Sequence, residues 1–446
     1  MQKVRAGFVS TGFFAYPRDV IERRAMAARE ALEGLDITLI VADPVVTDED
    51  IPRAVGQLQA GGDFDLLVCC VTTWTESPKI IGVLREFRHR PILLWSLGGY
   101  SEDGRLVSPA SAAGASAARG VLEAMGFKFK AVWDAPDAPM KLEEIREFAI
   151  VARAARRLTS SRIGLLGYAD MGLYNTMFDG SKLRDQIGVE VEGFDMLQVE
   201  QRAAKVGEAE AKALVADMRA KWQFEQEPSD QDLERLARIY LALKERVDER
   251  EYVAFSPKCV QGMSPYMGFT PCMVLSMMGD VTHCVCECDV PGAITQTMLG
   301  YVSGQPTTFV EWYEFWPDKI LGGVCGFVPF SMVEGPITVR RHGWGGFTGL
   351  ISTSQMKEGR VTLARLITFN DDLRMHIVTA EGHRPGEWQE LGWEPPAPRF
   401  PGLEFVLDEP VAEFAGHVAS QHYALAYGDH SAELIELCRL LDIRVV

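Results

Sequence analysis

The first third of the chain alternates continuous apolar runs with segments in which apolar residues recur every three or four positions. Each apolar run predicts a β-strand, and each periodic segment predicts a helix with one buried face. Strands that alternate with helices of this length form βαβ units and a parallel sheet. Uninterrupted apolar strands fit a sheet that is covered on both faces. The predicted strands span 4–11, 35–42, 64–71 and 90–97, and the predicted helices span 17–32, 48–60 and 78–87.

A second α/β alternation follows a long helix predicted at 141–158, which joins two domains. It begins with a strand near residue 162 and includes an apolar strand at 283–289 and a helix at 292–302. The same βαβ argument predicts a second parallel sheet here.

After Gly304, glycine and aromatic residues become frequent and short strand-like runs dominate, up to a terminal helix at 431–441. This pattern predicts a mainly β domain, either a barrel or a sandwich. The predicted fold class is therefore α/β, with two doubly wound parallel-sheet, Rossmann-like domains followed by a mainly β C-terminal domain. The predicted domains are an N-terminal α/β domain at 1–158, a second α/β domain with the candidate-site strand at 159–304, and the mainly β domain with its terminal helix at 305–446.

The composition is that of a globular protein, since 47% of the residues are hydrophobic and 24% are charged. A net charge of −17 repels phosphate backbones and acidic membrane surfaces, so neither nucleic acid nor a membrane is an expected partner, although solubility alone explains the charge. No apolar run approaches the ~20 residues that span a bilayer, and the N-terminus predicts a first strand rather than a signal peptide. Nine cysteines without a CxxC pair fit reduced thiols. Together these features predict a cytoplasmic protein.

The strand predicted at 283–289 carries the most distinctive chemistry. Side chains alternate between the two faces of a strand, so three cysteines share one face while His283, Glu287 and Asp289 share the other. Polar groups on an interior strand cost free energy unless they are paired, hydrogen-bonded or bound to a metal. The cysteine face fits burial better than a metal site. Neighbouring cysteines on one face of a strand lie ~7 Å apart, so three of them cannot all approach one zinc ion to the usual Zn–S distance of ~2.3 Å. The polar face therefore predicts a candidate site.

Other candidate ligand-binding residues lie at strand ends, where open α/β sheets bind their ligands. Tyr168 follows the first strand of the second α/β domain, and Trp74 follows a strand of the first. Trp74 could stack on a sugar or pack in the interior. Arg341 precedes a glycine-rich turn at 343–346 and could either grip an anionic or hydroxyl-rich ligand or form a solvated edge of that turn. His422 lies before the terminal helix, in a loop that could fold back onto the α/β cleft.

Four sequence blocks, in the expected order, resemble the L-fucose isomerase/L-arabinose isomerase superfamily. The segment CECDVPGAITQTMLGYVSGQPTTFVEWYEF is similar to the metal-site strand and following helix of that superfamily, and EGRVTLARL is similar to a segment of its C-terminal domain. The block SPKCVQGMSPYMGFTPC places two cysteines thirteen residues apart, as in the superfamily. The ending QHYALAYGDHSAELIELCRLLDI resembles the superfamily's C-terminus. These blocks span residues 256–446, and the α/β first half is compatible with the resemblance.

The resemblance implies an aldose–ketose isomerase that binds a divalent cation, often Mn²⁺, through two carboxylates and a histidine. Such enzymes move a proton between C1 and C2 of a sugar through an enediol that the metal stabilises. By position, Asp289 matches one carboxylate ligand and His422 matches the histidine ligand, but the second carboxylate is expected at Gly262, where this chain has no acid. Gln261 could offer a neutral oxygen to the substrate. Glu287 could compensate for the missing carboxylate ligand. Without a metal, Asp289 and Glu287 could instead be catalytic acid/base groups together with His422.

Three functions stay open at this point. A Mn²⁺-dependent aldose–ketose isomerase would lose activity with a chelator. An enzyme of the same fold with altered, metal-independent chemistry on a carbohydrate-like substrate would retain it. A non-catalytic carbohydrate-binding protein would bind a ligand without turnover. The resemblance also implies a homo-oligomer, a trimer or a hexamer, with a small-molecule sugar or sugar-like substrate.

Overall fold

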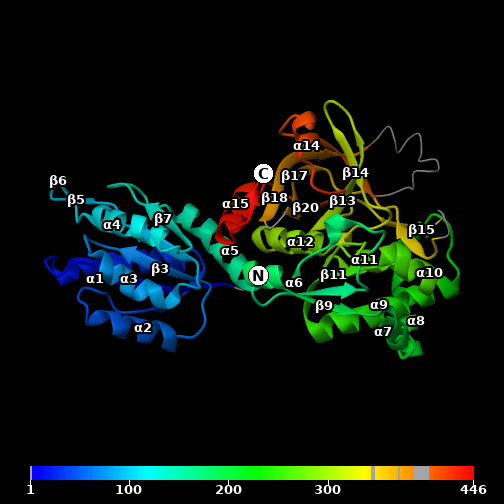
Figure 1. Ribbon diagram of the computed structural model, residues 1–446, viewed down its shortest axis with the longest axis horizontal. Helices are drawn as coiled ribbons and strands as arrows, with labels where there is room; N and C mark the ends of the chain where they lie inside the picture. The colour runs from blue at the N-terminus through cyan, green and yellow to red at the C-terminus, as the bar shows by residue number, and fades with distance from the viewer. Residues whose placement is uncertain (1–2, 343–346, 370–371, 386–400) are drawn as a thin grey trace. The chain divides into compact units, whose positions relative to one another are not determined.

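The chain folds into two compact units, Met1–Arg157 and Leu158–Val446 (Figure 1). The structure is a computed structural model, which describes residues 3–342, 347–369, 372–385 and 401–446. Within these ranges, no helix has the length and apolar character needed to cross a membrane. The predicted fold class is confirmed, because Rossmann-like parallel sheets are followed by a C-terminal region rich in antiparallel strands. The subdivision of the second unit at residue 304 stays a prediction.

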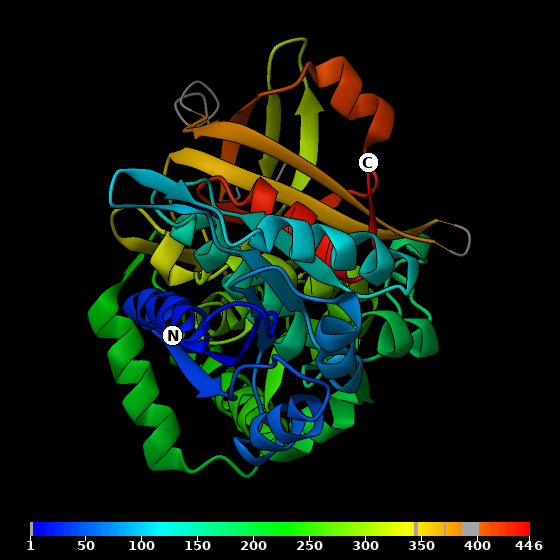
Figure 2. The same ribbon diagram turned by 90° about the vertical axis from the view of Figure 1, so that its left-hand side faces the viewer.

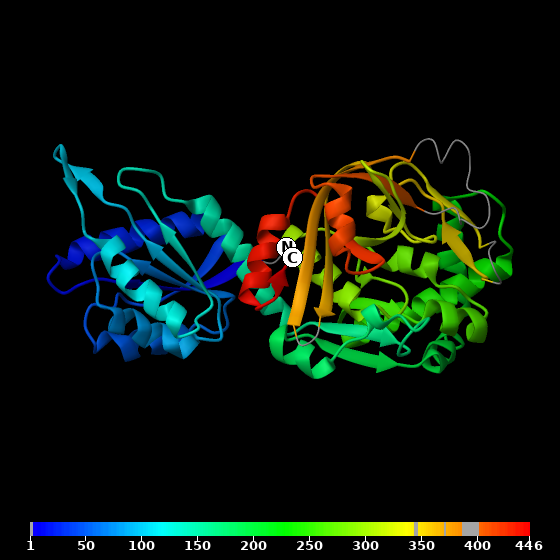
Figure 3. The same ribbon diagram turned by 45° about the horizontal axis from the view of Figure 1, so that its top comes forward.

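The first unit is built on a single parallel sheet with helices on both faces (Figure 3). Its elements are β1 (Val4–Thr11), α1 (Arg18–Gly34), β2 (Ile37–Val41), α2 (Asp50–Ala60), β3 (Leu66–Val71), α3 (Ser77–Leu84), β4 (Ile92–Ser96), β5 (Tyr100–Glu102), β6 (Arg105–Val107), α4 (Ser111–Ala124), β7 (Phe129–Trp133) and α5 (Leu142–Leu158). The strand order is β2-β1-β3-β4-β7. Residues of α2, α3 and α4 form one continuous apolar core with one face of this sheet. The apolar runs of the sequence are thus the buried strands of a covered sheet.

The second unit begins with a smaller parallel sheet. Its elements up to residue 303 are β8 (Arg162–Leu166), α6 (Gly180–Gln186), β9 (Glu190–Phe194), α7 (Met196–Ala203), α8 (Glu208–Lys221), β10 (Trp222–Phe224), α9 (Asp230–Arg250), β11 (Tyr252–Pro257), α10 (Ser264–Met267), α11 (Cys272–Met278), β12 (His283–Cys284) and α12 (Val290–Ser303). The strand order is β12-β11-β8-β9, with every neighbouring pair parallel. A capping box between Ser229 and Asp232 fixes the start of α9.

The rest of the second unit is mainly antiparallel. Its elements are β13 (Thr308–Phe315), β14 (Ile320–Gly323), β15 (Ile337–Arg341), β16 (Leu350–Ser352), β17 (Gly359–Phe369), β18 (Asp372–His383), β19 (Gly402–Leu407), α14 (Val411–His417), β20 (His422–Tyr427), α15 (Ser431–Leu440) and β21 (Arg444–Val445). The order β17-β20-β13-β14-β19-β18 closes into a barrel, because β18 also pairs with β17. Figure 2 shows these two long strands side by side. Closure leaves no free edge among these six strands, while β10, β15 and β16 form a separate small sheet.

Helix α12 positions the candidate site. Every residue from Val290 to Val302 is buried. The helix contacts β8, β11 and β12 of the parallel sheet and β13, β17 and β20 of the barrel. Its N-terminus therefore lies where the carboxyl ends of parallel strands meet barrel strands, which is a common place for ligand sites in α/β proteins.

The strand predicted at 283–289 is largely absent. Strand β12 ends at Cys284, and the chain then turns because Glu287 and Cys288 have φ values of 65° and 56°. Positive φ interrupts the extended backbone, so side chains beyond Cys284 do not alternate between two faces. The prediction of a continuous strand is therefore wrong. Nδ1 of His283 lies 2.8 Å from Oγ1 of Thr307, and His283 does not share a strand face with Glu287 and Asp289.

Candidate active site

Asp289 caps helix α12 and is completely buried. Its Oδ1 accepts a hydrogen bond from the backbone N–H of Gly292 at 2.9 Å. Its Oδ2 accepts hydrogen bonds from Arg365, on β17, and from Nδ1 of His422 at 2.8 Å. Burial alone would raise the pKa of Asp289, but the Arg365 guanidinium and the His422 imidazole lower that pKa well below its usual value. Asp289 is therefore an ionised carboxylate, held in place by three donors, on the Nδ1 side of the His422 imidazole.

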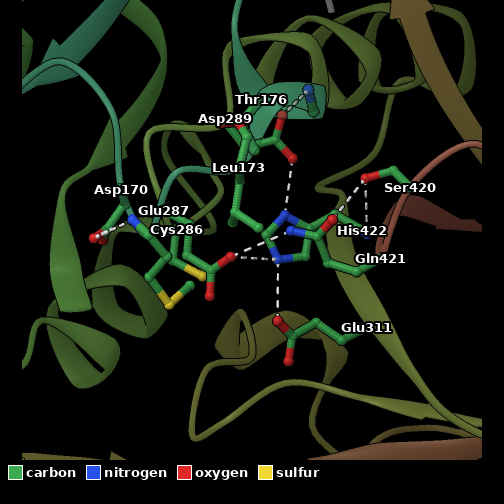
Figure 4. A network of polar contacts seen from close by, with 12 residues as sticks. Asp170, Leu173, Thr176, Cys286, Glu287, Asp289, Glu311, Ser420, Gln421 and His422 are labelled. Atoms are coloured by element: carbon green, nitrogen blue, oxygen red, sulfur yellow. Dashed lines mark hydrogen bonds and ion pairs between the residues drawn. The ribbon is translucent and has the colours of Figure 1, made fainter. Parts of the chain in front are cut away.

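The other edge of the His422 ring faces two glutamates (Figure 4). Nε2 lies 3.2 Å from Oε1 of Glu311 and 3.4 Å from Oε2 of Glu287. Glu311 is on β13 and pairs with His422 of β20 in the antiparallel register. Cross-strand partners bring their side chains close together. Glu287 reaches the same ring nitrogen from the turn that precedes α12.

The three carboxylates set the charge of this cluster. Burial lowers the pKa of His422, but its hydrogen bonds to Asp289 and Glu311 and the charge of Glu287 raise that pKa to about 10. Burial raises the pKa of Glu287 to about 7, a shift that the His422 charge opposes and the Glu311 charge reinforces. Burial also acts to raise the pKa of Glu311, but its hydrogen bond to His422 brings that pKa below its ordinary value. The cluster thus favours positive charge beside Nε2.

Polar neighbours hold the two glutamates in place. The side-chain amide of Gln421 donates to Oε2 of Glu287 at 3.3 Å, and its Oε1 accepts from the Asn175 amide at 2.6 Å. The hydroxyl of Tyr313 donates to Oε2 of Glu311 at 3.0 Å. Both oxygens of Glu311 are therefore engaged, whereas one oxygen of Glu287 is held by Gln421.

Glu287 and Glu311 line a cavity of about 300 Å³ within the second unit. Most of the wall is apolar or weakly polar, and it includes the thiols of Cys259, Cys272, Cys286 and Cys325 together with Val324 and Phe327. A small volume with few, convergent polar groups is typical of a small-molecule site. Water exclusion from such a site strengthens the electrostatic interactions inside it.

The comparisons with known proteins fit this arrangement. No family model matches the chain. It is 22% identical to a protein named sulfoquinovose isomerase from Priestia aryabhattai over 457 aligned positions, which cover 99% of each chain. It resembles sulfoquinovose isomerases along its whole length. A protein of that name from Priestia megaterium has the same identity and coverage, and one from Alkalicoccus urumqiensis is 23% identical over 388 positions, or 80% of each chain.

The structure brings together only some of the site residues that were predicted from the sequence. Glu287, Asp289 and His422 come together as described above. Gln261 is exposed, and its Oε1 accepts from the backbone N–H of Met171 at 3.1 Å. Tyr168 is 76% exposed.

The remaining two proposed residues do not line this cavity. Trp74 belongs to the first unit and packs edge-on against Phe13. Arg341 is exposed at the end of β15, with its Nε 3.5 Å from Oδ2 of Asp232. The neighbouring His342 does line the cavity. The glycine-rich turn at 343–346 lies outside the described residues.

Gly262, where the resemblance leads one to expect a carboxylate, has no room for a side chain. A Cβ added there would lie 2.7 Å from Cγ and 2.9 Å from Cβ of Lys258. The Lys258 side chain fills this space and places its Nζ 3.8 Å from the centre of the Tyr168 ring. The acid beside His422 comes instead from Glu311, forty-nine positions further along the chain.

Part of the donor set fits a divalent cation, since donor atoms of Glu287, His422 and Cys286 all lie within 4.8 Å of one another, a group that does not include Glu311. Two ligands ~2.1 Å from one tetrahedral ion lie about 3.4 Å apart, and the distances from Nε2 of His422 to the two glutamates are 3.2 and 3.4 Å. Asp289 only accepts hydrogen bonds when ionised, so Nδ1 of His422 carries a proton and the lone pair of a neutral ring is on Nε2. Carboxylate and imidazole donors suit Mn²⁺ and related ions.

Sequence reasoning missed Glu311, Arg365 and Gln421. All three lie in blocks that carry the family resemblance. A charged residue within the apolar run TFVEWYEF is the signal that could have pointed to Glu311, because a charge on a buried strand needs a partner. The pairing of Glu311 with His422 depends on the register of two strands more than a hundred residues apart, which the sequence does not display.

Proposed function

We propose that the protein is an aldose–ketose isomerase of the L-fucose isomerase/L-arabinose isomerase superfamily, acting on a sugar or sugar derivative. The observation that carries this proposal is the cluster of Glu287, Glu311 and His422, in which the two glutamates line a cavity and both lie beside Nε2 of the buried histidine. Full-length similarity to proteins named sulfoquinovose isomerase supports the same class of reaction, an intramolecular oxidation and reduction. Sulfoquinovose is accordingly the first substrate to test.

In this proposal Glu287, Glu311 and Nε2 of His422 hold a divalent cation, with Mn²⁺ the expected ion. The cation would contribute positive charge next to the substrate oxygens on C1 and C2. Asp289 acts from behind the imidazole rather than as a ligand, because its two oxygens already accept bonds from Gly292, Arg365 and His422. Such carboxylate–histidine pairs fix the ring and its tautomer.

Glu287 is the proposed acid/base group. Isomerisation of an aldose moves one proton from C2 to C1 and a second from the hydroxyl on C2 to the carbonyl oxygen on C1, so one group can take and return the carbon-bound proton. Without a bound cation, burial raises the pKa of Glu287 to about 7, so among the three carboxyl groups of the cluster it is the one that most readily gains a proton near neutral pH. Glu311 is the better anchored ligand, since Tyr313 holds its Oε2 while its Oε1 lies 3.2 Å from Nε2 of His422, on the side where the cation would bind.

Gln421 is proposed as a positioning residue for this step. Its amide holds Oε2 of Glu287 and is itself held by Asn175. A base whose position is fixed before the substrate binds needs little reorganisation during proton transfer. The apolar remainder of the wall keeps water away from the reacting carbons.

The test is product formation by the full-length protein in D₂O. NMR spectra of mixtures with sulfoquinovose and with a panel of other aldoses are expected to show a ketose, with deuterium at C1 to the extent that the proton on the base exchanges with solvent before it is returned. Glu287→Gln is expected to lose this turnover and also to bind Mn²⁺ more weakly, because the amide removes the charge of one ligand. Binding of these sugars without any ketose would instead favour the non-catalytic carbohydrate-binding alternative.

The superfamily resemblance also leads us to propose a homo-oligomer, a trimer or a hexamer. The mass of the 49.4 kDa chain in solution tests this by light scattering. A monomer at the concentrations used for assays would contradict it.

A further inference from the structure

A thiol lies beside the proposed cation ligands. Sγ of Cys286, a carboxylate oxygen of Glu287 and a ring nitrogen of His422 all lie within 4.8 Å of one another, and all three residues are buried. Cys286 and Glu287 line the same cavity, and Figure 4 shows the Cys286 side chain next to the Glu287 carboxylate. Among the described residues, Cys286 is the one cysteine that shares such a group with two other metal-binding side chains.

We propose that Cys286 turns this site into one that also binds thiophilic divalent ions, such as Zn²⁺, Co²⁺ or Cd²⁺, with its thiolate as a ligand. The inference rests on the proposed function in one respect, which is that the same Glu287 and His422 hold the cation. On binding, the thiol loses its proton to solvent and the sulfur lone pair forms the bond to the ion, so no oxidant or reductant takes part.

The chemistry of the donors separates two classes of ion. Mn²⁺ prefers carboxylate oxygens and imidazole, and it gains little from sulfur. Zn²⁺ combines Cys, His and Glu ligands in one tetrahedral site, with Zn–S bonds of ~2.3 Å and Zn–N bonds of ~2.0 Å. Ligands at these bond lengths lie roughly 3.5 Å apart. Closing the present spacing of up to 4.8 Å requires a shift of about one ångström, which is within the range of a cysteine side-chain rotation.

The cavity supplies a matched control. Cys272 lines the same cavity and is also buried, but it does not belong to the three-donor group. Cys272→Ser therefore removes a thiol from the cavity without removing the proposed ligand. Zn²⁺ binds more tightly than Mn²⁺ to almost any site of this kind, so the informative quantity is the ratio of the two affinities and how each substitution changes it.

The experiment uses the full-length protein after removal of bound ions by a chelator and dialysis. Affinities for Mn²⁺ and Zn²⁺ are measured by competition, and Co²⁺ is added for absorption spectroscopy. The wild-type and Cys272→Ser proteins are expected to show the sulfur-to-cobalt charge-transfer absorption. Cys286→Ser is expected to lose that absorption, to keep its Mn²⁺ affinity, and to lower the Zn²⁺-to-Mn²⁺ affinity ratio at least about tenfold.

Each remaining outcome is decisive. A Cys286→Ser protein with an unchanged affinity ratio and an unchanged cobalt spectrum would overturn the inference. So would a wild-type protein that binds Mn²⁺ but shows no sulfur-to-cobalt absorption, and in that case the proposed isomerase would stand. A wild-type protein that binds neither Mn²⁺ nor Co²⁺ would overturn both the inference and the cation site of the proposed function. Retained visible absorption of bound Co²⁺ in Cys286→Ser shows that the variant has folded.

Discussion

Glu311 and His422 face each other across the β13–β20 ladder, with Oε1 of the glutamate 3.2 Å from Nε2 of the imidazole. The opposite ring nitrogen, Nδ1, lies 2.8 Å from Oδ2 of Asp289. One histidine thus connects a barrel strand with the helix that follows the parallel sheet. This connection is the structural basis of the proposed site, and each prediction below changes one part of it.

Glu311→Gln should weaken Mn²⁺ binding at least about tenfold and reduce kcat by a similar or larger factor, because the amide keeps the shape but loses the charge. Isothermal titration with Mn²⁺ and an isomerase assay measure the two effects. Glu314→Gln is the control, since Glu314 lies on the same strand but is exposed. Equal affinities in the two variants would remove Glu311 from the ligand set.

Asp289→Asn should lower the free energy of unfolding by about 3–5 kcal/mol, because it leaves the fully buried Arg365 without its ionised partner. Adding Arg365→Met to this variant should recover part of the loss, since no uncompensated charge then remains. Denaturant unfolding of the single and double variants measures the difference. A double variant less stable than Asp289→Asn would show that the pair is not the source of the loss.

Gly262→Glu restores an acid at the position where the superfamily resemblance leads one to expect it. We expect no gain in Mn²⁺ affinity and a loss of about 1–3 kcal/mol in stability, because the new Cβ would lie 2.7 Å from Cγ of Lys258. Gly193→Glu is the control for a new acid with open space around it. Thermal unfolding and Mn²⁺ titration distinguish the cases, and tighter Mn²⁺ binding by Gly262→Glu would contradict the assignment of Glu311 as the second acid.

Thr270→Val should raise KM for the sugar about three- to tenfold with little change in kcat, which is the effect of losing one hydrogen bond to a bound substrate. Oγ1 of Thr270 is buried in the cavity and has no hydrogen-bond partner among the described residues. Thr282→Val is the control, because the Thr282 hydroxyl donates to the backbone oxygen of Tyr252 at 2.9 Å and does not line the cavity. An unchanged KM for Thr270→Val would exclude this contact.

Much of the fold could be predicted because periodicity and local signals agree. The helix predicted at 17–32 is α1 at Arg18–Gly34, and α9 begins at Asp230 because Ser229 and Asp232 form a capping box. The strand predicted at 283–289 failed because Glu287 and Cys288 adopt positive φ values, which residues other than glycine seldom do. Composition gives no signal for that turn.

The site could be predicted only in part, because tertiary packing and strand register decide which side chains meet. Position within the resembling blocks pointed to Asp289 and His422, and the predicted strand face pointed to Glu287; both acids lie beside the ring of His422. Which side of the imidazole each acid occupies depends on tertiary packing. Glu311 and Arg365 reach the cluster from two barrel strands, and only strand register decides which of their neighbours face inward.

The most direct test of the central claim is the rate of aldose-to-ketose conversion before and after removal of divalent cations. The full-length protein is treated with a chelator, dialysed, and assayed by NMR with sulfoquinovose and other aldoses while Mn²⁺ is added back. Our account predicts that conversion stops without the cation, returns as Mn²⁺ binds in a one-to-one ratio, and does not return in Glu311→Gln at the same concentration. Conversion that continues at full rate in the chelated protein would contradict it.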